Sequence, residues 1–214
     1  MTTQASLGDT HVAPAQSTSF DRFAGLCAIL TGIASFLYAV SFIILHNGLL
    51  SSLFLMLVGL FYTPALAVLY SRLRQASTAF PLWAFLLSSI GAFGAAIHGG
   101  YDLANAINPP TDYATIASLP SAIDPRGLLT FGIAGLGLFT ISWLIGHSTQ
   151  FPKALSYLGY LGAVLLIILY IGRLIILLPT NPLIAYPALM SGFLVSPIWY
   201  VWLGFVLWRG RSQA

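Results

Sequence analysis

Six long apolar segments dominate this sequence and constrain its fold more than any other feature. They lie near residues 22–45, 50–71, 81–104, 126–146, 153–178 and 187–208. A helix needs about 20 residues to cross the hydrocarbon core of a bilayer, so each segment is long enough to span it. The sequence therefore predicts an all-α fold, with a six-helix transmembrane domain over 21–210 and short tails at 1–20 and 211–214.

The composition supports a bilayer as the main partner. Only 6% of the residues are charged, and the chain contains no Glu and a single Lys, Lys153. A soluble domain usually has about a quarter of its residues charged, so this chain cannot cover a water-facing surface. The net charge is +3, but the basic residues are dispersed at helix ends, which excludes a nucleic-acid patch. Cys27 is the only cysteine, which excludes an intrachain disulfide.

Prolines mark the expected starts of four segments. Pro81, Pro125, Pro152 and Pro187 each stand at the beginning of an apolar run. Proline suits the first helical turn because its missing N–H would have no helical partner there. We also expect Asp124 to cap the fourth helix through its carboxylate.

The distribution of basic residues predicts how the chain is threaded. One side of the six-span arrangement carries Arg22, Arg72, Arg74, Lys153, Arg209 and Arg211. The other side has only Arg126 at a helix start, apart from Arg173 within the fifth segment. Because Lys and Arg favour the cytoplasmic side, both termini are predicted to be cytoplasmic. The even number of spans agrees independently with this orientation.

Small residues recur at four-residue spacing in two of the segments. The first has Ala24, Ala28 and Gly32, and the third has Gly91, Ala95 and Gly99. Such stripes allow close helix packing in a membrane. The sequence does not decide whether these seams lie within one chain or between chains, so a homo-oligomer remains open.

The third segment ends in an unusual polar cluster, in the stretch AAIHGGYDLANAINPP at 95–110. His98, Tyr101, Asp102 and Asn105 have the spacing i, i+3, i+4, i+7, which places them on one face of a helix. Asp102 is the only acid within a span, and Arg173 lies at a similar depth. A charge facing lipid is costly, so we expect Asp102 and Arg173 to form an ion pair, either structural or part of a ligand site.

These residues suggest a polar pocket that opens on the non-cytoplasmic side and binds or passes a small molecule or ion. The candidate ligand-binding residues are His46, His98, Tyr101, Asp102, Asn105, Arg126 and Arg173. No catalytic residue is assigned, because the sequence has no zinc-protease motif, nucleophile elbow or phosphate-binding glycine loop. The pattern therefore favours a protein that is not an enzyme.

Two alternative functions remain open, and with them the identity of any cofactor. His46 and His98 could be axial ligands of a haem, or the same region could hold a quinone in a redox protein. Alternatively, the chain could be a non-catalytic membrane subunit or partner-binding protein whose polar cluster only stabilises it. His98 and Asp102 have metal-ligand spacing, but two ligands do not define a metal site.

Two stretches carry a family resemblance. They are SWLIGHSTQFPKALSYLGYLGAVLLIILYIG at 142–172, with a basic-proline turn before LGYLG, and SPIWYVWLGFVLWRG at 196–210. The chain resembles an uncharacterised group of small bacterial six-helix membrane proteins, domain-of-unknown-function family four-three-eight-six. The resemblance implies a single six-helix domain in the bacterial cytoplasmic membrane. It implies no activity, and no functional residue.

Overall fold

Six helices account for nearly all of the computed structural model, which describes residues 19–74, 79–109, 123–176 and 181–209. Each of the six is long and apolar enough to cross a membrane, and no strand occurs in these ranges. The predicted all-α six-helix bundle is therefore confirmed. The predicted tails, apart from residues 19 and 20, lie outside the described residues.

Three of the six spans contain a short π-helical segment. The first span is α1 (Ser19–Ala39) followed by η1 (Val40–Ile44), and the fourth is η2 (Leu128–Ile133) followed by α5 (Ala134–His147). The last span consists of α7 (Pro182–Leu189), η3 (Met190–Val195) and α8 (Ser196–Trp208). The regular spans are α2 (Gly48–Leu73), α3 (Ala79–Ile107) and α6 (Lys153–Ile175).

Local capping explains where two of the spans begin. Asp124 Oδ2 accepts a hydrogen bond from the Thr130 N–H at 2.9 Å, which confirms the predicted capping role of this carboxylate. The last span begins at Pro182, five residues earlier than predicted, because the Asn181 side chain caps it by accepting from the Leu183 N–H at 3.0 Å. Pro187 therefore lies inside the helix rather than at its start.

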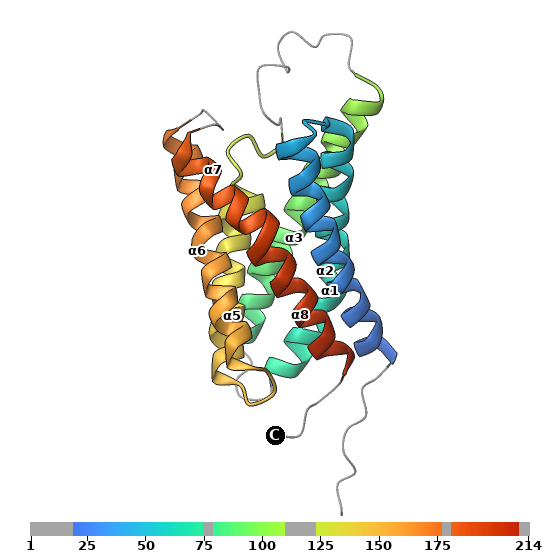
Figure 1. Cartoon of the computed structure of the whole chain (residues 1–214). Helices are drawn as coiled ribbons and strands as arrows, with labels where there is room; N and C mark the ends of the chain where they lie inside the picture. Colours follow the sequence, from blue (N-terminus) through green and yellow to red (C-terminus); the bar gives the residue numbers. More distant parts are fainter. Residues whose placement is uncertain (1–18, 75–78, 110–122, 177–180, 210–214) are drawn as a thin grey trace, which may run out of the picture.

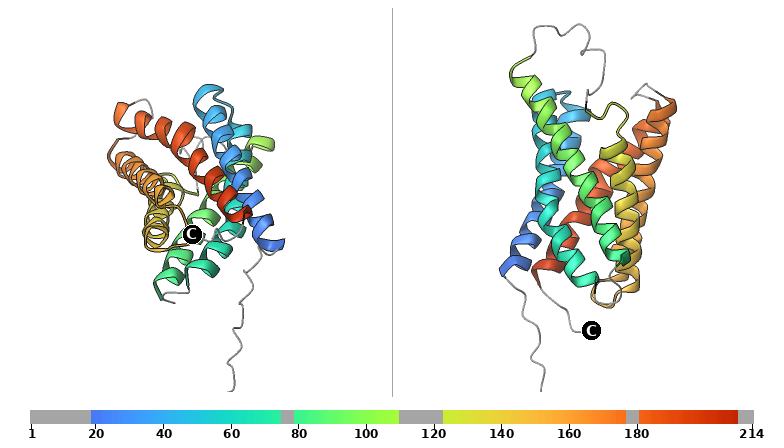
Figure 2. Two further views of the ribbon diagram at one scale, coloured as in Figure 1. Left: turned by 60° about the horizontal axis from the view of Figure 1, so that its bottom comes forward. Right: turned by 180° about the vertical axis from the view of Figure 1, so that it is seen from behind.

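The bundle has two ends of different character (Figure 1). We call the end where α1 begins and α8 finishes the closed end, and the end where η1 meets α2 and η2 begins the open end. The right-hand view of Figure 2 shows the same arrangement from behind. The basic residues of the described ranges that were predicted to be cytoplasmic, Arg22, Arg72, Arg74, Lys153 and Arg209, belong to helix ends at the closed end.

Large apolar side chains cover the outside of the bundle. Between 44% and 58% of each of the following is exposed: Phe23, Ile33, Phe93, Ile97, Leu161, Ile168, Leu194 and Phe205. A surface of this kind is stable only against hydrocarbon. The chain is accordingly a multi-pass integral membrane protein.

The closed end is tightly packed. Leu66, Leu69, Trp199, Leu203 and Leu207 are at most 1% exposed, and they fill the space between α2 and α8. An ion pair joins Asp21 to Arg72 at 3.1 Å, and the same guanidinium nitrogen of Arg72 donates to the Leu207 carbonyl at 3.3 Å. Three helices are thereby tied together where the bundle narrows.

Glycines form the close helix contacts within one chain. A Cβ added to Gly204 would lie 2.6 Å from the Gly25 carbonyl oxygen, so α1 and α8 touch through their backbones. A Cβ on Gly91 would lie 2.8 Å from the Ala134 Cα, in the contact between α3 and α5. The predicted seam of Gly91 therefore packs helices of the same chain against each other.

Candidate functional site: a cavity at the open end

A cavity of about 900 Å³ extends from the open end towards the middle of the bundle. At the open end it is lined by His46, Asn105 and Arg173, and its inner limit is formed by Tyr62 and Tyr200. All six spans contribute to its wall. The packed side chains of the closed end do not line it, so the cavity ends within the bundle.

The three π-helical segments all line this cavity. Residues from η1 (Phe42, Ile43), η2 (Thr130, Phe131) and η3 (Ser191, Gly192) form part of its wall. A π-helical turn contains an extra residue, which rotates the side chains that follow it around the helix axis. Such segments occur frequently at functional sites, and here they occur in three spans at one cavity.

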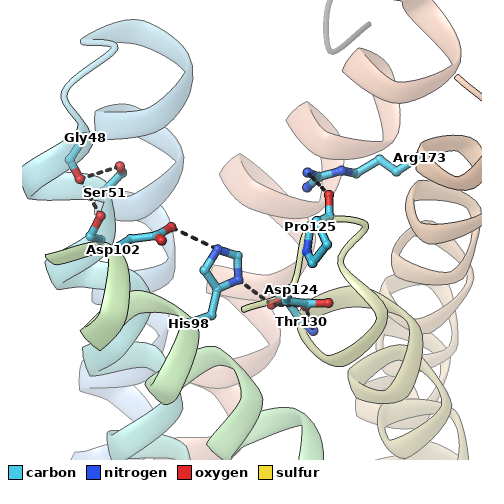
Figure 3. A network of polar contacts seen from close by, with 9 residues as sticks. Gly48, Ser51, His98, Asp102, Asp124, Pro125, Thr130 and Arg173 are labelled. Carbon is cyan, nitrogen blue, oxygen red and sulfur yellow. Dashed lines mark hydrogen bonds and ion pairs between the residues drawn. The ribbon is translucent and has the colours of Figure 1, made fainter. Parts of the chain in front are cut away.

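A chain of four polar side chains crosses from α3 to the start of η2 (Figure 3). Asp102 Oδ2 lies 3.1 Å from His98 Nε2, and His98 Nδ1 lies 3.1 Å from the Thr130 hydroxyl oxygen. That hydroxyl lies 2.8 Å from Asp124 Oδ2. We call Asp102, His98, Thr130 and Asp124 the polar relay. Only Asp102 and Thr130 line the cavity, while His98 and Asp124 are buried beside it.

The expected ion pair between Asp102 and Arg173 does not form. Asp102 pairs with His98, one turn earlier on its own helix. Arg173 instead donates to the Pro125 carbonyl at 3.5 Å, and its guanidinium lies 5.4 Å from the centre of the Phe131 ring. The prediction was wrong because the cavity separates α3 from α6 at this level, and because each charge already has a nearer partner.

The structure brings five of the seven candidate residues to the cavity wall. These are His46, Tyr101, Asp102, Asn105 and Arg173. His98 lies behind Asp102 and reaches the cavity only through it. Arg126 is exposed outside the cavity, where it donates to the Arg173 backbone carbonyl at 3.2 Å.

Sequence reasoning missed the aromatic floor of the cavity. Tyr62 and Tyr200 meet edge to face with ring centres 4.9 Å apart, and Trp199 packs against both rings. The Trp199 indole donates to the Leu155 carbonyl at 3.1 Å, which fixes this layer. Within the described residues neither tyrosine hydroxyl has a hydrogen-bond partner, so both remain available to a bound molecule. Both residues lie in otherwise apolar helices, where only the phenol hydroxyl distinguishes them from packing residues.

Serines around the cavity are less available than their number suggests. Ser51 and Ser52 line the wall, but both hydroxyls donate to the Gly48 carbonyl, at 3.0 and 2.6 Å. Ser191 and Ser196 bond to each other at 3.1 Å. Among the described residues, the Ser88 hydroxyl also lines the cavity and is buried without a hydrogen-bond partner. The polar groups that can meet a ligand therefore include this hydroxyl, the tyrosine hydroxyls, Asp102 and Arg173.

The fold and the cavity define a six-helix integral membrane protein with a site at one end. No family model, curated protein or solved structure matches the chain. Its function must therefore be argued from the site itself.

Proposed function

We propose that this protein binds a small organic molecule with an apolar body and a polar head, which enters from the non-cytoplasmic side. The observation that carries this proposal is the cavity of about 900 Å³ at the open end. Pockets for small ligands measure about 300–1,000 Å³, with mostly apolar walls and a few placed polar groups. The cavity fits this description.

The wall chemistry supports a ligand of this amphipathic shape. Leu55, Phe42 and Leu169 offer apolar contact to its body. Asp102 and Arg173 can meet its polar head. The basic residues at the closed end support the cytoplasmic placement of that end, which makes the open end the entrance from outside.

Binding is better supported than passage through the bundle. Leu66, Leu69 and Leu203 block the path below the aromatic floor, and each is at most 1% exposed. Transport would require the closed end to separate. The proposal therefore concerns binding, with transport as a further step that needs a second conformation.

Of the two redox alternatives, we favour a quinone over a haem. Both ring nitrogens of His98 already have partners in Asp102 and Thr130, which leaves neither free to coordinate a haem iron. A quinone has a polar head and an apolar tail, so it is one member of the proposed ligand class. Solvent extraction and an absorption spectrum of the purified protein distinguish a quinone from other ligands.

Family membership, location and assembly also stay proposals. The six-helix architecture agrees with the resemblance to the uncharacterised bacterial family, and with it a place in the bacterial cytoplasmic membrane. A homo-oligomer would need surfaces other than the Gly25–Gly204 contact, because that contact is used within one chain.

The proposal is tested by filling the cavity. Ala188 lines the cavity on α7, whereas Leu183 on the same helix is 66% exposed and points outward. We expect native mass spectrometry to detect a co-purified small molecule on the wild-type protein and on Leu183→Trp. The molecule should be lost from Ala188→Trp. Equal occupancy of both variants, or no bound mass on any of them, would favour the non-catalytic subunit instead.

A further inference from the structure

The first and last spans touch from the closed end upwards but separate before they reach the open end. At the closed end, a Cβ added to Gly204 would lie 2.6 Å from the Gly25 carbonyl oxygen. The contact continues as far as Ala39, whose Cβ would lie 2.8 Å from a Cβ added to Gly192. Beyond Ala39, η1 packs against α1 and α2, whereas α7 packs against α6 and η3. Figure 1 shows α7 and the end of the first span apart from each other at the open end.

Both spans change to a π-helical segment at the point where they separate. In the first span, η1 begins at Val40, directly after Ala39. In the last span, η3 (Met190–Val195) contains Gly192. A π-helical turn is one of the few local features that bend a helix sharply. The separation is therefore built into the two helices and not into the loops that follow them.

The separation gives the cavity a second opening, on the side of the bundle. Phe42 on η1 and Leu189 on α7 both line the cavity, and we call the gap between them the lateral opening. Phe42 is 51% exposed and Leu189 is 37% exposed, so neither side chain is covered by a neighbouring helix. Both are apolar, and both belong to spans that cross the bilayer. The lateral opening therefore faces the hydrocarbon of the leaflet at the open end.

Arg173 places a positive charge at the head-group level of the same leaflet. It lies on α6 two residues before the helix ends at Ile175, a distance of about 3 Å along the axis. Among the described residues no carboxylate pairs with Arg173. Its side chain makes one hydrogen bond of 3.5 Å to the Pro125 carbonyl and one contact with the Phe131 ring. A guanidinium has five N–H donors in a planar fork that fits a phosphate, so Arg173 has donors to spare for one.

We propose that the cavity takes up a phospholipid from the surrounding bilayer through the lateral opening, with the lipid phosphate at Arg173 and an acyl chain between η1 and α7. This inference rests on the proposed function and names its ligand class and route of entry. A lipid in this position keeps the orientation that it has in the leaflet, with its phosphate towards water and its chains towards the bilayer centre.

The lateral route also avoids the main cost of moving a long-chain lipid. Entry through water at the open end would expose the acyl chains, and the free energy of that exposure grows with every CH₂ group. Entry between Phe42 and Leu189 keeps the chains in contact with hydrocarbon or with apolar side chains throughout. A phospholipid is therefore the amphiphile for which the lateral opening makes the largest difference.

Site-specific photo-crosslinking in phosphatidylglycerol vesicles tests the inference. Benzoylphenylalanine replaces one phenylalanine at a time: Phe42 at the lateral opening or Phe131 on the cavity wall. Irradiation should add the mass of a phospholipid at both positions. Phe151, which is 5% exposed in the packed closed end and does not line the cavity, should gain none. Phe93, which is 53% exposed on the outside of α3, reports the lipid that surrounds any membrane protein.

Replacement of Arg173 separates a bound phospholipid from surrounding lipid. Arg173→Gln should reduce the adducts at Phe42 and Phe131 by about fivefold or more, because the charge-assisted bonds to phosphate are lost. The adduct at Phe93 should not change. Arg173→Lys keeps the charge and should retain most of the adduct, which controls for loss of folding. Arg126→Gln, which removes an exposed charge outside the cavity, should change all three adducts by less than about twofold.

A chain-matched lipid without phosphate completes the experiment. Diacylglycerol mixed into the vesicles should form an adduct at Phe93 and little at Phe131. Adducts at Phe42 that are as insensitive to Arg173→Gln as those at Phe93 would show surrounding lipid only and overturn the inference. The inference also fails if Phe131 gains no phospholipid while native mass spectrometry finds another molecule in the cavity, a result that leaves the proposed function intact. Absence of any bound molecule in both experiments would count against the proposed function as well.

Discussion

Each end of the bundle contains an aspartate and an arginine, but only at the closed end do the two form an ion pair. At the closed end, the charges of Asp21 and Arg72 meet directly and apolar side chains fill the remaining space. At the open end, Asp102 and Arg173 stand apart on different walls of a cavity. The comparison teaches that burial of opposite charges in one bundle does not imply that they pair. The closed end pairs Asp21 with Arg72 internally, whereas the open end leaves Arg173 without a carboxylate partner among the described residues.

We expect the largest difference in the free energy of unfolding when one leucine at each end is replaced by alanine. Leu203 is fully buried at the closed end, and Leu55 is 6% exposed but borders the cavity. Leu203→Ala should lower the free energy of unfolding by about 2–5 kcal/mol, because it opens a new void. Leu55→Ala enlarges an existing space and should cost less, about 2 kcal/mol, because mainly the transfer term of the removed carbons is lost. Unfolding in mixed micelles measures both values, and equal losses would contradict the distinction.

Replacing one glycine at each end compares how closely the helix backbones pack there. Gly204→Ala should destabilise the protein by about 1–3 kcal/mol, because the added methyl group would overlap the Gly25 carbonyl. Gly48, at the start of α2 near the open end, has nothing within 4 Å of an added Cβ. Gly48→Ala should leave stability unchanged or raise it by up to about 1 kcal/mol, because alanine favours the helix. Thermal unfolding of the two variants in the same detergent compares them, and a loss at Gly48 would show hidden packing there.

Double-mutant cycles on the unliganded protein probe the pairing itself. His98→Gln and Asp102→Asn should be non-additive, with a coupling of about 0.5–1.5 kcal/mol in unfolding free energy, because their side chains are in contact. Asp102→Asn and Arg173→Gln should be additive within about 0.5 kcal/mol, because the cavity separates them. The reverse pattern would indicate that Asp102 pairs with Arg173, as the sequence predicted.

These contacts also define what could be predicted from the sequence. Apolar length was enough to find all six spans, because lipid imposes that length on every crossing, whereas the proline positions misplaced the start of the last span. Helical spacing correctly brought Tyr101, Asp102 and Asn105 to one wall. It could not identify the partner of Asp102, because spacing gives a face and a depth on one helix but not which helices are neighbours. The π-helical segments changed the faces further, and no sequence signal indicated them.

The polar relay gives a second example of contacts that could not be predicted from the sequence. Asp124 was expected only as a helix cap, and it does cap η2 through the Thr130 N–H. Its second role, as the end of a hydrogen-bonded chain from His98, depends on the contact between α3 and η2. Contacts of that type become visible only in three dimensions.

Sided accessibility of single cysteines tests the central claim, that one end of the bundle is open and the other closed. Replacement of Cys27 by Ser gives a cysteine-free background, into which Ala188→Cys places a thiol on the cavity wall and Leu69→Cys a thiol at the closed end. A membrane-impermeant thiol reagent should modify position 188 only from the non-cytoplasmic side and position 69 from neither side. Modification of position 188 from the cytoplasmic side, or from neither side, would contradict the account.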